Sequence, residues 1–326
     1  MTPLETLARR LHAWEPNTDT NEFQRRARLL QALWRDERGL PVGSMRGKPR
    51  GALIAMPLAE ETLANYLDDT IRAVVRREVL DPSKAKGKLF GRPRIFNNLL
   101  SSQPLCFNLF GHLAEDLALA SAVLAEMTRG RVGSVTALEF EVSPGRGDPA
   151  YTGDKSAFDV FVEHTTPEGG RGFLGIEVKY HEGLGDKAAG HRARYDELAD
   201  AMGCFEPGRR QDLQRKPLQQ IWRDHLLAGA VRLVDGYDDG QFVFLSPAGN
   251  PRCASAVADY AACLTRQDSF DAWTLERLVA VIGRHSDAAW VDAVHRRYLD
   301  FARIDAALGA VPRPGAEPSS GGSIPS

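Results

Sequence analysis

The sequence predicts an α/β protein in which helices pack on a mixed β-sheet. Ala157 to His164 and Gly172 to Tyr180 are rich in Phe, Val and Ile and flank the turn-forming segment Thr-Pro-Glu-Gly-Gly, which is typical of an antiparallel hairpin. The short continuous apolar run Gln241 to Leu245 is typical of a central strand. From Phe107 onward the predicted order is helix, strand, strand, strand, helix, helix, strand, which favours one layered α/β core.

Helices are predicted where apolar residues recur every three or four positions. Glu22 to Arg38 follows a capping residue at Thr20 or Asn21, and Phe107 to Arg129 is expected to form one continuous helix. The other predicted helices are Leu4 to Trp14, Glu60 to Leu80, Asp186 to Ala201, Pro217 to Val234, Ala254 to Leu264 and Leu275 to Leu308. Val135 to Val142 alternates apolar and polar residues and is predicted to be the strand before the hairpin.

The predicted elements divide the chain into four parts. Residues 1–100 form a helical N-terminal extension packed on the core, 101–250 the α/β core, and 251–310 a C-terminal helical segment. Residues 311–326 are too poor in apolar residues to fold and are expected to be disordered. No repeat of fixed period is visible, which excludes solenoids and propellers.

Composition excludes several classes of protein. The formal net charge of −2 is near neutral, so any binding of nucleic acid requires a local basic face. The four cysteines are scattered without CxxC spacing, which supports neither a zinc site nor a disulfide framework. The N-terminus lacks the pattern of a signal peptide, and no apolar run approaches the length of a membrane span. A soluble protein of the reducing cytoplasm, without a membrane partner, is therefore expected.

The predicted hairpin has ionisable residues where a buried strand would be apolar. Asp159 interrupts the first run, and Glu177 and Lys179 bracket Val178 in the second. Because side chains of a strand alternate between faces, Glu177 and Lys179 are expected to point to the same side. Two ionisable groups are thereby brought to one place.

This set of residues is suited to metal-assisted hydrolysis of a phosphodiester. Mg²⁺ prefers oxygen ligands, typically one or two carboxylates with water and substrate phosphate in the remaining positions. Asp159 and Glu177 would supply the carboxylates and the backbone carbonyl of Val178 a third oxygen, with Lys179 beside the attacking water. The alternative is a surface Glu–Lys ladder on an edge strand, which contributes a few tenths of a kcal/mol at most.

Two further features bear on this interpretation. Asp116 falls within the apolar stripe of the helix predicted from Phe107, where a carboxylate needs a partner, whereas Glu115 falls on the flank. A hydrogen bond to a backbone amide and a functional role explain Asp116 equally well.

The basic segment from Lys84 to Arg94 contains five cations and no acid, and it suits either contact with nucleic-acid phosphates or a solvated loop. Its cations are Lys84, Lys86, Lys88, Arg92 and Arg94, and Arg46, Lys48 and Arg50 form a second basic stretch upstream.

The spacing of Asp159 and Glu177-Val178-Lys179 resembles the Asp…(Asp/Glu)-x-Lys signature of the PD-(D/E)XK nuclease superfamily. The predicted element order between Phe107 and Pro247 is similar to the αβββαβ core of that superfamily. Phe158 stands where the name of the superfamily has proline. The sequence around these residues is also similar to that of restriction-endonuclease-like bacterial members. The similar segments of this chain are Ser-Ala-Phe-Asp-Val-Phe, Gly-Ile-Glu-Val-Lys-Tyr-His-Glu and, upstream, Cys-Phe-Asn-Leu-Phe-Gly.

The resemblance implies a restriction-endonuclease-like fold and a Mg²⁺-dependent endonuclease acting on DNA in restriction, defence or DNA processing, with Mn²⁺ as a substitute. It implies metal binding by Asp159 and Glu177 and catalysis by these two residues with Lys179. An acid on the first helix contributes to the metal site in several members, which makes Asp116 the candidate here and Glu115 the second choice. Because each chain carries one such site, cutting both strands is expected to need a homodimer or two encounters.

Two alternatives are weighed against this function. A nucleic-acid-binding protein of the same fold without cleavage would not need Asp159, Glu177 and Lys179, and an unrelated α/β protein would place Asp159 far from Glu177. His181 is expected to be solvated or to touch the scissile phosphate. His225 lies on the apolar stripe of its helix and is expected to be a core residue.

Overall fold

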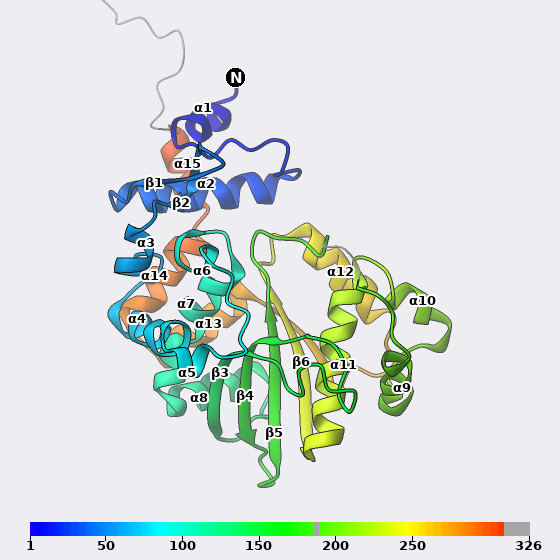
Figure 1. The fold of residues 1–326 in the computed structure, drawn as a ribbon. Coiled ribbons are helices and arrows are strands. Elements are labelled where there is room, and N and C mark those ends of the chain that lie inside the picture. Colours follow the sequence, from blue (N-terminus) through cyan, green and yellow to red (C-terminus); the bar gives the residue numbers. More distant parts are fainter. Residues whose placement is uncertain (186–188, 310–326) are drawn as a thin grey trace, which may run out of the picture.

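The computed structural model describes residues 1–185 and 189–309, and its centre is a five-stranded mixed sheet (Figure 1). The strands lie in the order β3 (Val135–Val142), β4 (Phe158–Thr165), β5 (Arg171–Val178), β6 (Asp239–Ser246) and β7 (Phe270–Thr274). The pairs β3–β4 and β4–β5 are antiparallel, and β5–β6 and β6–β7 are parallel. The predicted α/β class with a mixed sheet is confirmed.

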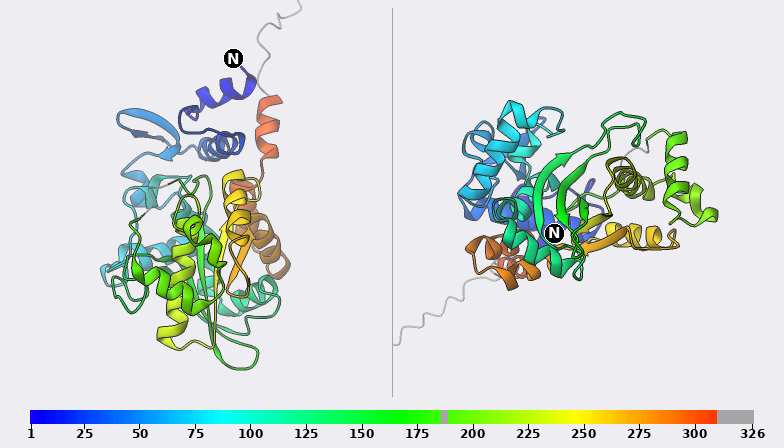
Figure 2. Two further views of the ribbon diagram at one scale, coloured as in Figure 1. Left: turned by 90° about the vertical axis from the view of Figure 1, so that its right-hand side faces the viewer. Right: turned by 90° about the horizontal axis from the view of Figure 1, so that it is seen from below.

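Helices cover both faces of this sheet, as the view along the strands shows (Figure 2, right). One face packs against α4 (Asp69–Val75), α7 (Ser102–Glu115), α8 (Leu117–Met127), α13 (Leu275–His285) and α14 (Ala289–Tyr298), and the other against α9 (Ala193–Met202), α11 (Leu218–Asp235) and α12 (Pro251–Ala261). Val160 and Ile176 belong to the first core, whereas Phe161 and Phe173 belong to the second. Because strand residues alternate, Asp159 and Glu177 lie on the face covered by α11.

The two ends of the chain form a layer at one end of the molecule (Figures 1 and 2). It consists of α1 (Pro3–Arg10), α2 (Glu22–Glu37), the hairpin β1 (Val42–Met45) and β2 (Lys48–Ile54), and α15 (Ala302–Gly309). Gln31 on α2 donates hydrogen bonds to the Tyr180 hydroxyl (3.2 Å) and to the Arg297 carbonyl (2.9 Å). The layer is thereby joined to the segment that follows β5.

Three predicted helices are interrupted. The span 60–80 forms α3 (Leu58–Thr62), α4 and a π-helix (Arg76–Leu80), because Leu63 adopts the left-handed conformation (φ 52°) and ends α3. The span 107–129 divides at Asp116, whose φ and ψ of −125° and 89° are not helical. The span 275–308 divides into α13, α14 and α15. In each case the recurrence of apolar residues in the sequence continues across a position at which the backbone leaves the helical conformation.

Several short elements were not predicted. They are the β1–β2 hairpin, α5 (Pro82–Ala85), α6 (Arg94–Asn97), a 3₁₀ turn (Pro207–Arg209), α10 (Arg210–Leu213) and β7. Strand β7 lies within the segment 251–310 that was expected to be helical. Helix α9 begins at Ala193, and the predicted start at Asp186 lies outside the described residues. The predicted disordered tail 311–326 lies outside the described residues. Among the helices that the structure describes, none is both long and apolar enough to span a membrane.

Candidate active site

Three carboxylates lie in one row across the sheet. Phe140 and Val142 of β3 pair with Val160 and Phe158 of β4, which places Glu141 opposite Asp159. The pair formed by Val160 and Ile176 places Asp159 opposite Glu177 in the same way. The register of β3, β4 and β5 thus brings Glu141, Asp159 and Glu177 to neighbouring positions on adjacent strands.

The residues of the predicted site meet at the end of β5. The Lys179 Nζ atom donates a hydrogen bond of 2.7 Å to Glu177 Oε1, and the Gln220 side chain on α11 donates to the same oxygen at 2.7 Å. Asp159 Oδ2 accepts a hydrogen bond of 2.8 Å from the Val178 amide. The other carboxylate oxygens, Asp159 Oδ1 and Glu177 Oε2, accept none from the described residues, so each has its lone pairs free for another ligand.

Burial and neighbouring charges shift the pKa values of Asp159 and Lys179. Burial raises the pKa of Asp159 well above its usual value, and the charge of Glu177 raises it further. Burial acts to lower the pKa of Lys179, but the charges of Glu177, Glu182 and Asp159 outweigh it and raise the pKa above its usual value. In this state Lys179 is therefore an ammonium group that donates a hydrogen bond to Glu177.

A cavity of about 550 Å³ opens beside these residues. Its walls include Ser102 and Gln103 from the start of α7 and residues of α11. Three exposed cations also line it, namely Arg94, Lys155 and Lys216. The cavity thus combines carboxylates at its base with a cationic rim, which suits a phosphate group held near a metal ion.

The donor set fits a hard divalent cation. It consists of carboxylate oxygens that repel one another, and a cation between them would relieve that repulsion. Within the described residues, no three His, Cys, Asp or Glu side chains stand close enough together to hold an ion by themselves. Mg²⁺ requires fewer, since it is commonly bound by one or two carboxylates with water and phosphate completing its coordination.

The structure does not bring Asp116 into this cavity. Asp116 is exposed between α7 and α8, which pack on the face of the sheet opposite α11, and its Oδ1 accepts a hydrogen bond of 2.9 Å from the Leu119 amide. Its carboxylate caps the N-terminus of α8, which agrees with the first of the two interpretations, a hydrogen bond to a backbone amide. Glu115 is also absent from the cavity and forms an ion pair of 2.6 Å with Arg77.

The cations of the basic segment from Lys84 to Arg94 differ in their surroundings, and the segment reaches the cavity at Arg94. Lys88 forms an ion pair of 2.9 Å with Glu78, and Arg92 lies over the ring of Phe96. Lys84 and Lys86 are exposed, and only Arg94 of the five cations lines the cavity. The upstream stretch from Arg46 to Arg50 forms the turn of the β1–β2 hairpin and the start of β2.

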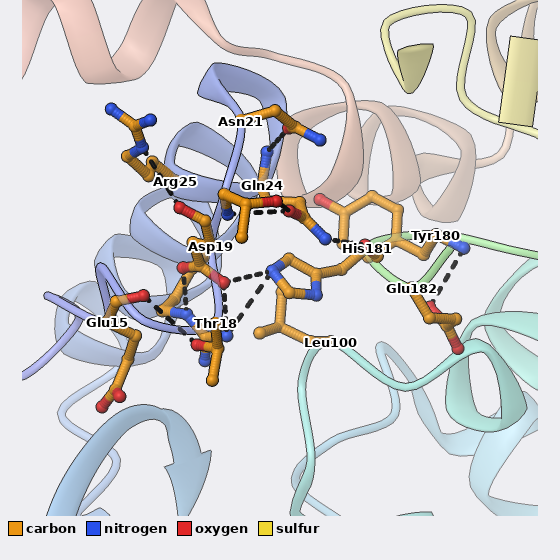
Figure 3. Close-up of polar contacts among 12 residues, drawn as sticks. Glu15, Thr18, Asp19, Asn21, Gln24, Arg25, Leu100, Tyr180, His181 and Glu182 are labelled. Carbon is orange, nitrogen blue, oxygen red and sulfur yellow. Dashed lines mark hydrogen bonds and ion pairs between the residues drawn. The ribbon is translucent and has the colours of Figure 1, made fainter. Parts of the chain in front are cut away.

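His181 takes neither of the two expected positions. Its side chain points to the carboxylate of Asp19, with 2.9 Å between Nε2 and Oδ1, and Asp19 is in turn bound by Arg28 (Figure 3). The imidazole therefore joins the end of the β5 segment to the N-terminal layer. His225 is fully buried and contacts the hydroxyl groups of Tyr260 and Ser269, which confirms a core residue.

Several residues at the cavity were not singled out from the sequence. Among them are Glu141 on β3 and Gln220 and Asp224 on α11. Glu141 lines the cavity and has a left-handed backbone (φ 52°), which is unusual for a residue within a strand. Burial and the charge of Glu177 raise the pKa of Glu141. The alternation of the predicted strand Val135 to Val142 was the available signal for Glu141, but it did not indicate the register.

Asp154 binds two residues that line the cavity, Ser156 and Arg223. Its Oδ2 accepts hydrogen bonds from the Tyr195 hydroxyl (2.6 Å) and from Arg223 Nε (2.9 Å) and Nη2 (2.6 Å), and its Oδ1 accepts one from the Ser156 amide (2.8 Å). Burial acts to raise the pKa of Asp154, but the hydrogen bonds and the charge of Arg223 outweigh it and lower the pKa to about 2. Two nitrogens of Arg223, Nε and Nη2, are thus engaged within the protein.

We expect Asp154→Asn to destabilise the protein in a pH-dependent way. Because folding lowers this pKa from 3.8 to about 2, the ionised carboxylate stabilises the folded state above pH 3.8, and this contribution disappears as the pH falls toward 2. The substitution should cost about 1 to 2 kcal/mol at neutral pH, with allowance for solvent screening, and less in acid. Urea unfolding at several pH values measures it, and an unchanged difference at pH 2.5 and 7 would contradict the assignment. Asp148→Asn in the same loop is the control.

The five-stranded mixed sheet and its flanking helices are those of a restriction-endonuclease-like fold. The family model of the PD-(D/E)XK nuclease superfamily matches residues 17–300, and the chain therefore belongs to this superfamily. A comparison with curated proteins gives no match, and neither does a comparison with solved structures. Membership supports a nuclease-type function, and the match extends beyond the predicted core into both terminal segments.

Proposed function

We propose that the protein is a metal-dependent endonuclease that hydrolyses phosphodiester bonds of DNA. The observation that supports this most is the placement of Asp159 and Glu177 opposite each other on β4 and β5, with the Lys179 ammonium on Glu177. All three line one cavity with a cationic rim. A protein that only binds nucleic acid needs none of these three groups, and burying them would cost free energy without benefit.

Each residue has a distinct role in the proposed reaction. Asp159, Glu177 and the carbonyl of Val178 would hold a Mg²⁺ or Mn²⁺ ion, which neutralises phosphoryl charge and lowers the pKa of a bound water. Gln220 donates to Oε1 of Glu177 and leaves Oε2 free to serve as a ligand of such an ion. Lys179, held protonated, donates a hydrogen bond to the attacking water or to a phosphate oxygen, and so orients the reactants and stabilises the transition state.

A cleavage assay tests this function. Duplex, single-stranded and branched DNA and a matched RNA would be incubated with Mg²⁺, Mn²⁺ or EDTA, and the products separated by electrophoresis. We expect cleavage of DNA with either metal and none with EDTA. Binding of DNA without cleavage of any substrate would instead favour a catalytically silent nucleic-acid-binding protein of the same fold.

We also propose an oligomeric state and a setting for the reaction. Each chain supplies one set of catalytic residues, so double-strand cleavage would require a homodimer or two encounters. We place the activity in the cytoplasm, in restriction, defence or DNA processing. An accumulation of nicked circular plasmid before the linear form would indicate that the strands are cut in separate encounters.

We also expect the basic segment to contribute to DNA binding. Replacing Lys84, Lys86 and Arg94 with alanine removes three exposed cations of this segment, whereas Lys88 and Arg92 are held by contacts within the protein. The logarithm of the DNA-binding constant decreases with the logarithm of the salt concentration, and the size of this slope should be reduced by up to about 2.7, because each phosphate contact contributes about 0.9.

The control for this experiment removes the same charge elsewhere, by replacing Arg10, Arg129 and Arg232 with alanine. Fluorescence anisotropy of labelled DNA at several salt concentrations gives both slopes. Equal reductions in the two triple variants would mean that the basic segment acts through net charge alone.

A further inference from the structure

A second hollow, a groove of about 350 Å³, adjoins the catalytic cavity. One side of the groove is formed by the β1–β2 hairpin, and the other by the segment before α7 and the segment after β5. Arg94 and Glu182 line both the groove and the cavity. Ser101 lines the groove and the next residue, Ser102, lines the cavity. The groove thus continues the cavity toward the N-terminal layer.

One face of the hairpin is turned to this groove. Met45 of β1 and Arg50 of β2 line it. Lys48 pairs with Met45 and is two residues from Arg50 on the same strand, so it lies on the same face. A Cβ atom on Gly51 would lie 3.1 Å from Ala32, which places the other face of β2 against α2. The hairpin is therefore covered by α2 on one face and faces the groove with the other.

The tip of the hairpin projects from the N-terminal layer and carries free cations (Figure 2, left). Its two-residue turn is Arg46-Gly47, in which both residues have a left-handed backbone (φ 54° and 73°). Such a turn favours Asn, Asp or Gly at its first position, and another residue there costs about 1 to 2 kcal/mol. Arg46 and Lys48 are exposed and form no ion pair with a described residue. The turn itself thus gives no reason for a cation at position 46.

The cations inside the groove are neutralised by the protein. Arg28 forms an ion pair with Asp19, and Arg50 forms one with Glu15. Arg94, where the groove meets the cavity, is exposed and has no such partner among the described residues. The free positive charge therefore lies on the hairpin and at the mouth of the cavity, an arrangement that attracts a polyanion along the groove.

We propose that the β1–β2 hairpin is a DNA-binding arm that contacts the duplex beyond the scissile phosphate. This role rests on the proposed function and adds a contact surface outside the catalytic cavity. A two-stranded ribbon has a width that the major groove of B-DNA admits. Arg46 and Lys48 bind backbone phosphates, and Met45, which is 53% exposed, makes an apolar contact with the DNA. The arm strengthens binding and takes no part in the chemical step.

Fluorescence anisotropy of labelled DNA tests this proposal. The full-chain variant Arg46→Ala/Lys48→Ala is compared with the wild type in EDTA at several salt concentrations. We expect weaker binding and a salt dependence whose slope is smaller by up to about 1.8, because each phosphate contact contributes about 0.9. Single-turnover cleavage at saturating enzyme should keep the wild-type rate. A reduced rate at saturation with unchanged binding would overturn the proposal.

The matched control is Arg10→Ala/Arg129→Ala, which removes two exposed cations that line neither the cavity nor the groove. Arg129 has a left-handed backbone (φ 58°), so the control repeats the alanine substitution in the conformation of Arg46. Arg46→Gly/Lys48→Gln removes the hairpin charges with a residue that favours the turn, and it should bind DNA as weakly as the alanine variant. Equal slopes in the control and the hairpin variants would contradict the role of the arm.

Photo-crosslinking locates the arm on the DNA. The four native cysteines are buried, so the exposed thiol of Met45→Cys can be labelled selectively with a benzophenone. We expect crosslinks to DNA beside the cleavage site, and none from Leu233→Cys, which is exposed near the start of β5. Equal yields from the two positions would exclude a specific contact. Crosslinks to a second copy of the chain in place of DNA would assign the hairpin to a protein interface and reject the proposal.

These outcomes are distinct from failure of the proposed function itself. If the chain does not act on DNA, the wild type neither binds nor cleaves it. If only the role of the hairpin is wrong, the wild type binds and cleaves DNA, and the hairpin and control variants do so to the same extent.

Discussion

Replacement of Lys179 with alanine is expected to reduce the rate of DNA cleavage by about 10²- to 10³-fold, the effect of removing one preorganised donor to the transition state. The ammonium is held by Glu177 and lines the cavity. Of the other described cations that line it, Arg94, Lys155 and Lys216 are exposed at the rim and Arg223 is bound to Asp154. Single-turnover cleavage with saturating enzyme measures the loss directly, without a contribution from product release.

Two controls keep this result interpretable. Lys179→Met retains most of the buried volume of the side chain, so an equal loss of rate in both variants would exclude a packing defect. Mn²⁺ binding should persist in both, because the carboxylates remain. Cleavage at the wild-type rate by a folded Lys179→Ala protein would remove Lys179 from the catalytic residues.

The second large effect is expected for Asp159→Asn. The amide has nearly the shape of the carboxylate, and its oxygen can still accept the hydrogen bond from the Val178 amide. The negative charge that faces Glu177 is lost, so Mn²⁺ binding at that position should be abolished and cleavage should fall at least about 10³-fold. Without metal, the variant should be as stable as the wild type or more stable, because a buried repulsion is removed.

Glu139→Gln is the matched control for Asp159→Asn. Glu139 lies on the neighbouring strand β3, is exposed, and does not line the cavity. The pair is compared by calorimetry with Mn²⁺, by cleavage and by thermal unfolding. Equal Mn²⁺ affinity in Asp159→Asn and the wild type would show that the metal binds elsewhere.

The hairpin was the most predictable part of the site because its information is local. The alternation of a strand has a period of two, so Glu177 and Lys179 could be assigned to one side from the sequence alone. The pairing of β4 with β5 then follows from the short turn between them. Asp116 was harder, since apolar spacing continues from α7 into α8 and hides the break that Asp116 caps.

The remaining residues depend on contacts that the sequence does not specify. Gln220 and Asp224 reach the cavity because α11 crosses the sheet at a particular angle and rotation, which its mostly apolar surface leaves undetermined. Glu141 depends on the register of β3 and on a single left-handed residue. Strand β7 pairs in parallel with β6, and parallel neighbours are separated by a long connection that leaves no local signal.

The layer formed by the two ends of the chain bears on the order of events during synthesis. The Tyr180 hydroxyl donates to the Tyr298 carbonyl (3.3 Å), and Gln31 donates to the Arg297 carbonyl, a contact between residues 266 positions apart. Contacts of such separation form late, because the intervening chain must first be available. A ribosome-bound chain therefore contains the complete hairpin well before Tyr180, in the segment after β5, gains its partner on α14.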